Sequence, residues 1–157
     1  MHKTIFVYFS YSGGNDKIAK HLQDELGCDI LKLETEATYS PTSLKTMFAG
    51  GMESVRKISP ALKPYTFDSA KYDNIIIGTP VWAWTFSPAL RTFTDHTKVK
   101  GKNVLLTCTH GGKPGKTIEK LTDLFAGNNI LFKKEIKVPI TTDILEKISL
   151  EIAEILR

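Results

Sequence analysis

Short apolar runs alternate with longer segments of helical periodicity along this chain, and the alternation restricts its fold more than any other feature. The apolar runs cover residues 3–9, 28–34, 74–79, 102–109 and 129–138. Such short continuous runs are typical of strands buried on both faces of a parallel sheet, with helices as the crossover connections. The sequence therefore predicts an α/β fold, a three-layer doubly wound sheet of five parallel strands.

Local start and stop residues support the helices between these runs. We expect helices over residues 16–26, 43–57, 116–125 and 141–156, and one more that begins near residue 88. Gly27 is placed to end the first helix in a left-handed conformation. Ser87 is placed to cap the helix in which Pro88 takes the first position. Two adjacent glycines weaken the helix over 43–57.

Length and composition favour one globular domain over residues 1–157. The chain is 41% hydrophobic and 24% charged, which is ordinary for a globular protein and argues against a disordered or fibrous chain. No apolar run approaches the ~20 residues that a membrane-spanning helix needs, and the N-terminal segment is too polar for a signal peptide. We therefore expect a cytoplasmic protein without membrane attachment.

Charge and cysteine content argue against two further classes of function. The net charge is 21 − 17 = +4, but the lysines are scattered. Because the chain also lacks a basic arm, a zinc knuckle and an aromatic RNA-binding strand, we expect no nucleic-acid partner. The two cysteines are too few for a disulfide framework and form no metal-ligand spacing with the four histidines. We expect two reduced thiols and no metal.

Three loops that follow predicted strands carry the residues best suited to ligand binding. In an open parallel sheet, ligands bind beyond the carboxyl ends of the strands, where the strand order reverses. The loops read SYSGGN (10–15), TPVWAWTF (79–86) and TCTHGGKPG (107–115). Their compositions differ, and each loop suits a different part of one ligand.

The first loop has the features of an anion site at the start of a helix. Helix N-termini offer unpaired backbone N–H groups and a partial positive charge. Gly13 and Gly14 let the backbone approach a ligand closely, and Ser10, Ser12 and Asn15 add neutral donors. A phosphate suits this loop, and a tight glycine turn with a Ser or Asn helix cap is an equal alternative.

The second and third loops add a flat surface and a polar edge. Trp82 and Trp84 are the only tryptophans of the chain, and a planar ring that stacks on an indole gains ~0.5–1.5 kcal/mol beyond area burial. One of the two indoles could instead pack beneath the loop. The third loop supplies hydroxyls, a thiol, an imidazole and glycine backbone, which suit hydrogen bonding to the edge of a heterocycle.

A nucleotide-binding motif is a rival interpretation of the third loop. Its continuation HGGKPGKT ends like a P-loop, with Gly115, Lys116 and Thr117 between a strand and a helix. The first glycine of that motif would fall at His110, and Gly111 is one residue too close to replace it. The dinucleotide fingerprint G-x-G-x-x-G is also absent. The sequence therefore does not favour a kinase or an NTPase.

A phosphate loop, an aromatic platform and a polar glycine-rich edge together describe a site for FMN. The sequence resembles the flavodoxin family, whose phosphate loop has hydroxyl, glycine and amide positions matched by Ser10, Ser12, Gly13 and Asn15. It is most similar to a branch with the segments YDNIIIGTPVW (72–82) and KGKNVLLTCTHGG (100–112). The resemblance implies a flavodoxin-like sheet of order 2-1-3-4-5, in the short-chain form without the long insertion in the last strand, and FMN as cofactor.

The resemblance also implies which side chains surround the FMN. The first loop would hold the phosphate, the second would line the ring, and the third would flank the other edge of the ring. The residues so predicted are Ser10, Tyr11, Ser12, Gly13, Gly14, Asn15, Thr79, Pro80, Val81, Trp82, Ala83, Trp84, Thr109, His110, Gly111 and Gly112.

The redox role is argued from charge and from the ring loop. A basic chain stabilises an anionic reduced flavin, which predicts a higher reduction potential than that of the acidic carriers of the family. The ring loop has Ala83 where such carriers often have a small or glycine residue whose peptide flips, and a non-glycine residue at positive φ costs about 1–2 kcal/mol. We therefore hypothesise two-electron chemistry.

These arguments lead to an FMN-dependent oxidoreductase that moves electrons from NAD(P)H or a reductase to a quinone-like or protein acceptor. His110 is the candidate proton donor, because its ordinary pKa lies near neutrality, although a loop histidine that faces water is the simpler interpretation. A pure electron carrier between partner proteins is the alternative, and a binding module without redox activity is a third. The oligomeric state stays open.

Overall fold

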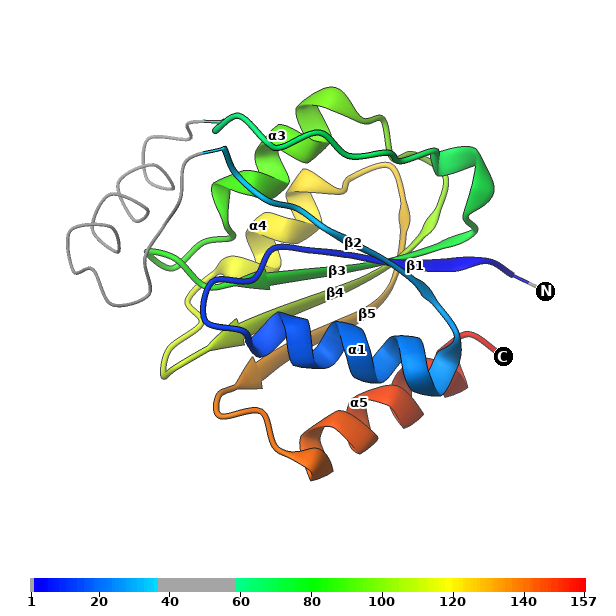
Figure 1. Ribbon diagram of the computed structural model, residues 1–157, viewed down its shortest axis with the longest axis vertical. Coiled ribbons are helices and arrows are strands. Elements are labelled where there is room, and N and C mark those ends of the chain that lie inside the picture. The colour runs from blue at the N-terminus through cyan, green and yellow to red at the C-terminus, as the bar shows by residue number, and fades with distance from the viewer. Residues whose placement is uncertain (1, 37–58) are drawn as a thin grey trace.

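A five-stranded parallel sheet forms the centre of the computed structural model, which describes residues 2–36 and 59–157 (Figure 1). The strand order β2-β1-β3-β4-β5 confirms the predicted order 2-1-3-4-5. The chain therefore adds β2 on one side of β1, and then adds β3, β4 and β5 in turn on the other side. The strands are β1 (Thr4–Tyr8), β2 (Asp29–Lys32), β3 (Asn74–Pro80), β4 (Asn103–His110) and β5 (Asn129–Lys137).

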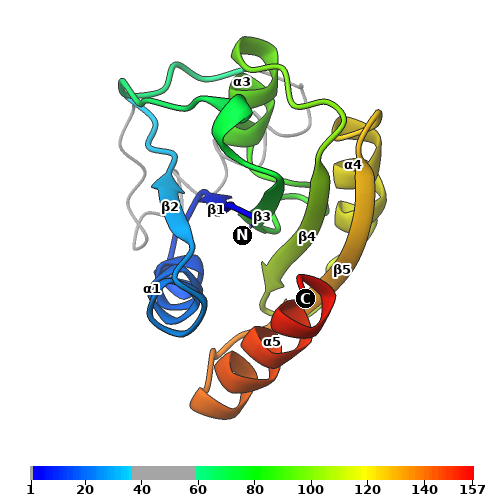
Figure 2. The same cartoon turned by 90° about the vertical axis from the view of Figure 1, so that its right-hand side faces the viewer.

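Helices cover both faces of the sheet, which gives the three predicted layers (Figure 2). One face carries α1 (Gly14–Leu26) and α5 (Thr142–Ile155), and the other carries α3 (Pro88–His96) and α4 (Thr117–Leu124). A short 3-10 helix, η1 (Ser69–Lys71), precedes β3. The helix predicted over 43–57 lies outside the described residues.

The predicted helix boundaries are confirmed where caps were expected. Gly27 ends α1 with φ 63° in the left-handed region, and its N–H bonds to the carbonyl of Gln23. The Ser87 hydroxyl accepts a hydrogen bond from the N–H of Ala89 at 3.3 Å, and Pro88 occupies the first helical position. Because α1 starts at Gly14 and not at residue 16, the glycine loop leads directly into the helix.

The core consists of two clusters, one on each side of the sheet. Alternate residues of β3 face opposite layers, so Ile75 and Ile77 pack toward α3 and α4 while Ile76 packs toward α1 and α5. Six of the seven residues of β3 are buried, as the continuous apolar run predicted. By contrast, exposed positions of β5 alternate with partly buried ones and with the buried Ile136, since the strand lies at the edge of the sheet.

Side-chain amides link the starting residues of four strands in one row. Asn74 Nδ2 donates to Thr4 Oγ1 at 3.2 Å, Asn103 Nδ2 donates to Asn74 Oδ1 at 3.0 Å, and Asn129 Nδ2 donates to Asn103 Oδ1 at 3.1 Å. These residues are also partners in the strand register. We call this row the amide ladder. A shift of one residue in any pairing would break it, so the ladder favours a single register.

Membrane spans and metal-ligand clusters are not found in residues 2–36 and 59–157. No helix there is long and apolar enough to cross a bilayer, and no three His, Cys, Asp or Glu side chains there are grouped to hold a metal ion. Cys28 and Cys108 are buried free thiols. Burial is the main cause that raises their pKa values, to about 11 and about 12 respectively. Both thiols are therefore protonated at neutral pH and pack as small apolar groups.

Candidate functional site

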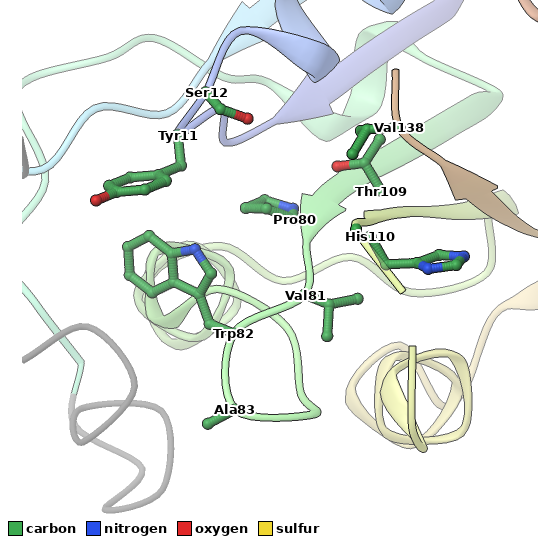
Figure 3. Close-up of a pocket in the computed structure, with 10 residues that line it drawn as sticks. Tyr11, Ser12, Pro80, Val81, Trp82, Ala83, Thr109, His110 and Val138 are labelled. Carbon is green, nitrogen blue, oxygen red and sulfur yellow. The ribbon is translucent and has the colours of Figure 1, made fainter. Parts of the chain in front are cut away.

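A cavity of about 440 Å³ lies at the carboxyl edge of the sheet, among the loops that follow β1, β3 and β4 (Figure 3). The strand order reverses beside it, between β1 and β3, which is where open parallel sheets bind ligands. Its volume is within the usual range for small-molecule sites. The lining residues are Tyr11, Ser12, Pro80, Val81, Trp82, Ala83, Thr109, His110, Gly111 and Val138.

The loop after β1 presents unpaired donors at the start of α1. Gly13 occupies the cap position with φ 91°, a left-handed conformation that only glycine adopts easily. No side chain caps this helix end, so the N–H groups of its first turn stay available. The Ser10 hydroxyl is buried and has no hydrogen-bond partner among the described residues. Such an arrangement suits an anion that brings its own acceptor oxygens.

The charge of Asp16, in the first turn of α1, is balanced within the protein. Its Oδ1 accepts a hydrogen bond from the Tyr8 hydroxyl at 3.1 Å and lies 2.9 Å from Lys32 Nζ. Burial, followed by the nearby Asp16 carboxylate, raises the pKa of Tyr8 well above its usual range, so the phenol keeps its proton. The carboxylate therefore opposes an anion at the helix end less than its position alone would suggest.

Asn15 lies beneath the loop and does not line the cavity. Its side chain is 1% exposed, and its Nδ2 donates to the carbonyl of Phe9 at 3.0 Å and to Thr109 Oγ1 at 3.4 Å. Its Oδ1 has no partner among the described residues. The amide that we expected to face a phosphate instead connects the end of β1 to the end of β4.

Trp82 lies on the cavity wall between two other aromatic rings. Its indole meets the ring of Phe9 at a centroid distance of 5.4 Å and the ring of Tyr11 at 5.2 Å, both edge to face. Figure 3 shows Tyr11 beside Trp82 on the same side of the cavity. These contacts restrict the orientation of the indole, so a planar ligand meets a wall that is already formed.

Trp84, by contrast, points outward from a tight turn. The backbones of Trp82 and Thr85 exchange hydrogen bonds of 2.9 and 3.0 Å, and the two residues between them have positive φ, 47° for Ala83 and 59° for Trp84. This is the geometry of a two-residue hairpin that normally uses Asn or Gly. Ala83 thus has a positive φ although it is not glycine, so the cost of that conformation no longer argues for two-electron chemistry.

The remaining predicted residues hold the loops together or contribute to the wall. Thr79 is buried, and its Oγ1 accepts from the N–H of Ser87 at 2.8 Å and donates to the carbonyl of Pro80. The N–H of Val81 donates to the carbonyl of Thr109 at 2.9 Å. His110 has a buried Nδ1 without a partner among the described residues, and its ring is directed away from Trp82 (Figure 3).

The structure thus divides the predicted residues into two groups. Every residue of the cavity lining was predicted from the sequence except Val138. Outside the lining lie Ser10, Gly13, Gly14, Asn15, Thr79, Trp84 and Gly112. Val138 follows the edge strand, and its N–H donates to the carbonyl of His110 at 2.9 Å. The predicted strand order places the fifth strand beside the fourth, and this was the one signal that could have indicated Val138.

Comparison with known proteins gives a consistent result. The family described as Flavodoxin matches residues 3–150. No curated protein is significantly similar to the chain in sequence.

Three solved structures illustrate the similarity of fold. A candidate flavoprotein from Bacteroides eggerthii has a TM-score of 0.81 and 22% identity, over 100% of this chain and 99% of that one. A flavoprotein from Lactobacillus acidophilus, solved in complex with FMN, has a TM-score of 0.74 and 24% identity, over 86% and 93%. Oxidised flavodoxin 1 from Bacillus cereus has a TM-score of 0.64 and 17% identity, over 98% and 97%.

Proposed function

The chain belongs to the flavodoxin family, and we propose that it is a flavoprotein that binds one FMN in the cavity at the carboxyl edge of its sheet. The similar flavoprotein from Lactobacillus acidophilus was solved in complex with FMN. When bound, FMN supplies the capacity to accept and donate electrons. The protein contributes the binding, the orientation and the surroundings of the ring.

The unpartnered hydroxyl of Ser10 is the observation that carries this proposal. A buried hydroxyl without a hydrogen bond costs about 1–3 kcal/mol, and here it lies in the loop that leads into the uncapped N-terminus of α1. A phosphate at this helix end would accept from that hydroxyl and from the backbone N–H groups. Binding of the phosphate would then remove the free-energy cost of the unpaired Ser10 hydroxyl.

The other side of the cavity suits the ring of the same ligand. Trp82 and Tyr11 form an aromatic wall, and Thr109 and Gly111 lie on the β4 side. The hydrogen bond between Val81 N–H and Thr109 carbonyl joins the two sides at their base. We assign these residues to the ring, and Ser10, Ser12 and Gly13 to the phosphate. Because the ring of His110 points away from Trp82, we assign it no proton transfer.

The proposed role is electron transfer from NAD(P)H or a reductase to a quinone-like or protein acceptor. A carrier that passes electrons between partner proteins is the second candidate, and the turn with two positive φ values favours it, because the objection to one-electron chemistry depended on Ala83. We also propose a cytoplasmic location, since both cysteines are unpaired thiols.

A titration of flavin-stripped protein with FMN tests the cofactor, with flavin fluorescence as the readout. We expect saturable quenching at one FMN per chain. Ser12→Asp should weaken binding at least about tenfold, because it places a like charge beside the phosphate. Ser69→Asp, the same change before β3 at the opposite end of the sheet, is the control. Equal binding by the two variants, or no quenching by the unchanged protein, would contradict the proposal.

A second assay separates the enzyme from the carrier. NAD(P)H and a soluble quinone are added to the FMN-loaded protein, and NAD(P)H absorbance is followed. An oxidoreductase consumes NAD(P)H unaided, whereas a carrier does so only after a reductase protein is added.

A further inference from the structure

Trp84 points outward beside the cavity, from a turn in which two non-glycine residues have positive φ. Its side chain is 64% exposed, and it adjoins Ala83, which lines the cavity. A non-glycine residue in the left-handed region costs about 1–2 kcal/mol, and here two such residues follow one another. Large aromatic side chains are normally buried for stability, so this exposure needs another explanation.

The opposite loop is shaped to support the turn. Gly115 has φ +59°, and a Cβ atom at that position would lie 2.7 Å from the Cβ of Trp84. The base of the Trp84 side chain therefore lies directly against the backbone of Gly115, and a side chain at position 115 would collide with it. The turn is supported in this position by a neighbouring loop, in addition to its own pair of hydrogen bonds.

Two lysines flank Gly115 and give this surface a positive charge. Lys113 and Lys116 are both exposed. Neither forms an ion pair within the part of the chain that the structure describes. Glu119, in the first turn of α4, is the nearest carboxylate in sequence, and none of the ion pairs among the described residues joins it to either lysine. The charge is therefore available to a partner. We call Trp84, Lys113 and Lys116 the basic rim.

A protein fits the basic rim better than a small molecule does. Small ligands bind in concave sites that enclose most of their surface, whereas Trp84 lies outside the cavity lining. An exposed tryptophan is a typical anchor of a protein interface, and charges around such an anchor steer the approach of an oppositely charged partner. Electron transfer also requires the two redox centres to come close together, and Trp84 directly follows Ala83, which lines the cavity.

We propose that the basic rim is the docking site for a redox partner protein whose surface is acidic around its own redox centre. The inference rests on the proposed FMN site. In the complex, reduced FMN would be oxidised by two one-electron transfers, each of which reduces one partner molecule, and its protons would pass to solvent. The net charge of +4 agrees with an acidic partner.

Cytochrome c in its native basic form and in its succinylated acidic form is the probe, because the two forms differ mainly in the sign of their surface charge. FMN-loaded protein is reduced and mixed with each form at low ionic strength in a stopped-flow instrument. We expect the acidic form to be reduced at least about tenfold faster, with an advantage that disappears as salt is added. Lys113→Glu with Lys116→Glu should reverse this preference.

The control is Lys98→Glu with Lys100→Glu, which makes the same change of net charge at the amino edge of the sheet. It should keep most of the preference for the acidic form. Trp84→Gly, which suits the positive φ of the turn, should slow reduction of the acidic form about tenfold while FMN affinity stays within twofold.

Equal effects of the two lysine pairs would overturn the inference, because net charge alone would then explain the rates. An unchanged rate in Trp84→Gly would also overturn it. Competition by a small anionic aromatic compound, with no effect of the acceptor's charge, would identify a small-molecule site instead. If the unchanged protein does not bind FMN, the proposed function fails, and that result is seen in the titration before any cytochrome is added.

Discussion

The two edges of the central sheet treat their polar groups in opposite ways. At the amino edge, the amide ladder pairs each side chain with its neighbour on the next strand. At the carboxyl edge, three buried side-chain atoms of the described residues have no partner, namely Ser10 Oγ, Asn15 Oδ1 and His110 Nδ1. Buried polar groups in native proteins are almost always hydrogen-bonded. The contrast teaches that one edge is organised for stability and the other for a ligand.

The largest loss of stability is expected from Gly78→Ala, a change in β3 near the carboxyl edge of the sheet. The new Cβ would lie 2.5 Å from Cζ of Phe6 and 3.2 Å from Oδ1 of Asn15. We expect a loss of about 3 kcal/mol in the free energy of unfolding, because the packed core cannot move aside. Urea unfolding measures it. Gly112→Ala, which meets no atom within 4 Å, is the control, and equal stability of both variants would contradict the packing argument.

Alkaline pH should lower the free energy of unfolding through one buried thiol at each edge of the sheet. Cys28 precedes β2 and Cys108 lies near the end of β4, and their folded pKa values of about 11 and about 12 exceed the ordinary value of 9.0. A raised folded pKa stabilises the protein below pH 9, and this stability is lost as pH rises toward 11 to 12. Between pH 8 and 10 each thiol should account for a loss of about 1.4 kcal/mol.

Replacement of one thiol isolates its contribution to that loss. In Cys108→Ala the decrease in unfolding free energy from pH 8 to pH 10 should be smaller by about 1.4 kcal/mol. Cys28→Ala should show the same reduction at the other edge. The slopes are compared, not the stabilities at one pH, because each variant also leaves a cavity. Unchanged slopes in both variants would show that other groups cause the alkaline loss.

A break in the amide ladder should lower stability without affecting FMN. Asn103→Leu leaves the Oδ1 of Asn74 and the Nδ2 of Asn129 without their partners. We expect a loss of about 1 kcal/mol, measured by urea unfolding, because the row is partly open to water. FMN affinity should stay within twofold of that of the unchanged protein. A large loss of affinity would show that the two edges are coupled, against the comparison made above.

The last variant, Ser10→Ala, is expected to raise the stability of the flavin-free protein. An unpartnered buried hydroxyl costs about 1–3 kcal/mol, and the Ser10 hydroxyl has no partner in the described residues, so its removal should add about 1 kcal/mol to the free energy of unfolding. FMN affinity should fall about tenfold, since a hydrogen bond to the phosphate is lost. A clear loss of stability without FMN would mean that the hydroxyl already has a structural role.

Sequence patterns predicted the elements better than the directions of side chains. Runs of apolar residues and the caps at Gly27 and Ser87 depend on local chemistry, and the structure confirms them. The direction of Asn15 depends on Thr109, which is far away in sequence. The outward position of Trp84 depends on the glycine opposite it. Neither contact leaves a periodic signal in the sequence, so both residues were predicted among the ligand contacts.

The amide ladder was also not predicted, although each of its asparagines is the first or second residue of a predicted strand. A single asparagine before an apolar run indicates only a boundary, because asparagine is common in turns. Its meaning appears when four strand starts are aligned side by side. The strand order supplies that alignment, and it came from a family resemblance and not from the residues themselves.

Because the strand starts are aligned, the length of each strand decides how far along the strand direction its following loop begins. From the common row, β1 continues to Tyr8, β3 to Pro80 and β4 to His110, in register with one another. At about 3.3 Å per residue, the end of β4 therefore stands about 10 Å beyond the end of β1. The carboxyl edge descends in steps from the third loop to the first. Unequal strand lengths thus give the cavity a sloping floor, lowest at the helix end that suits an anion and highest where the ring would lie.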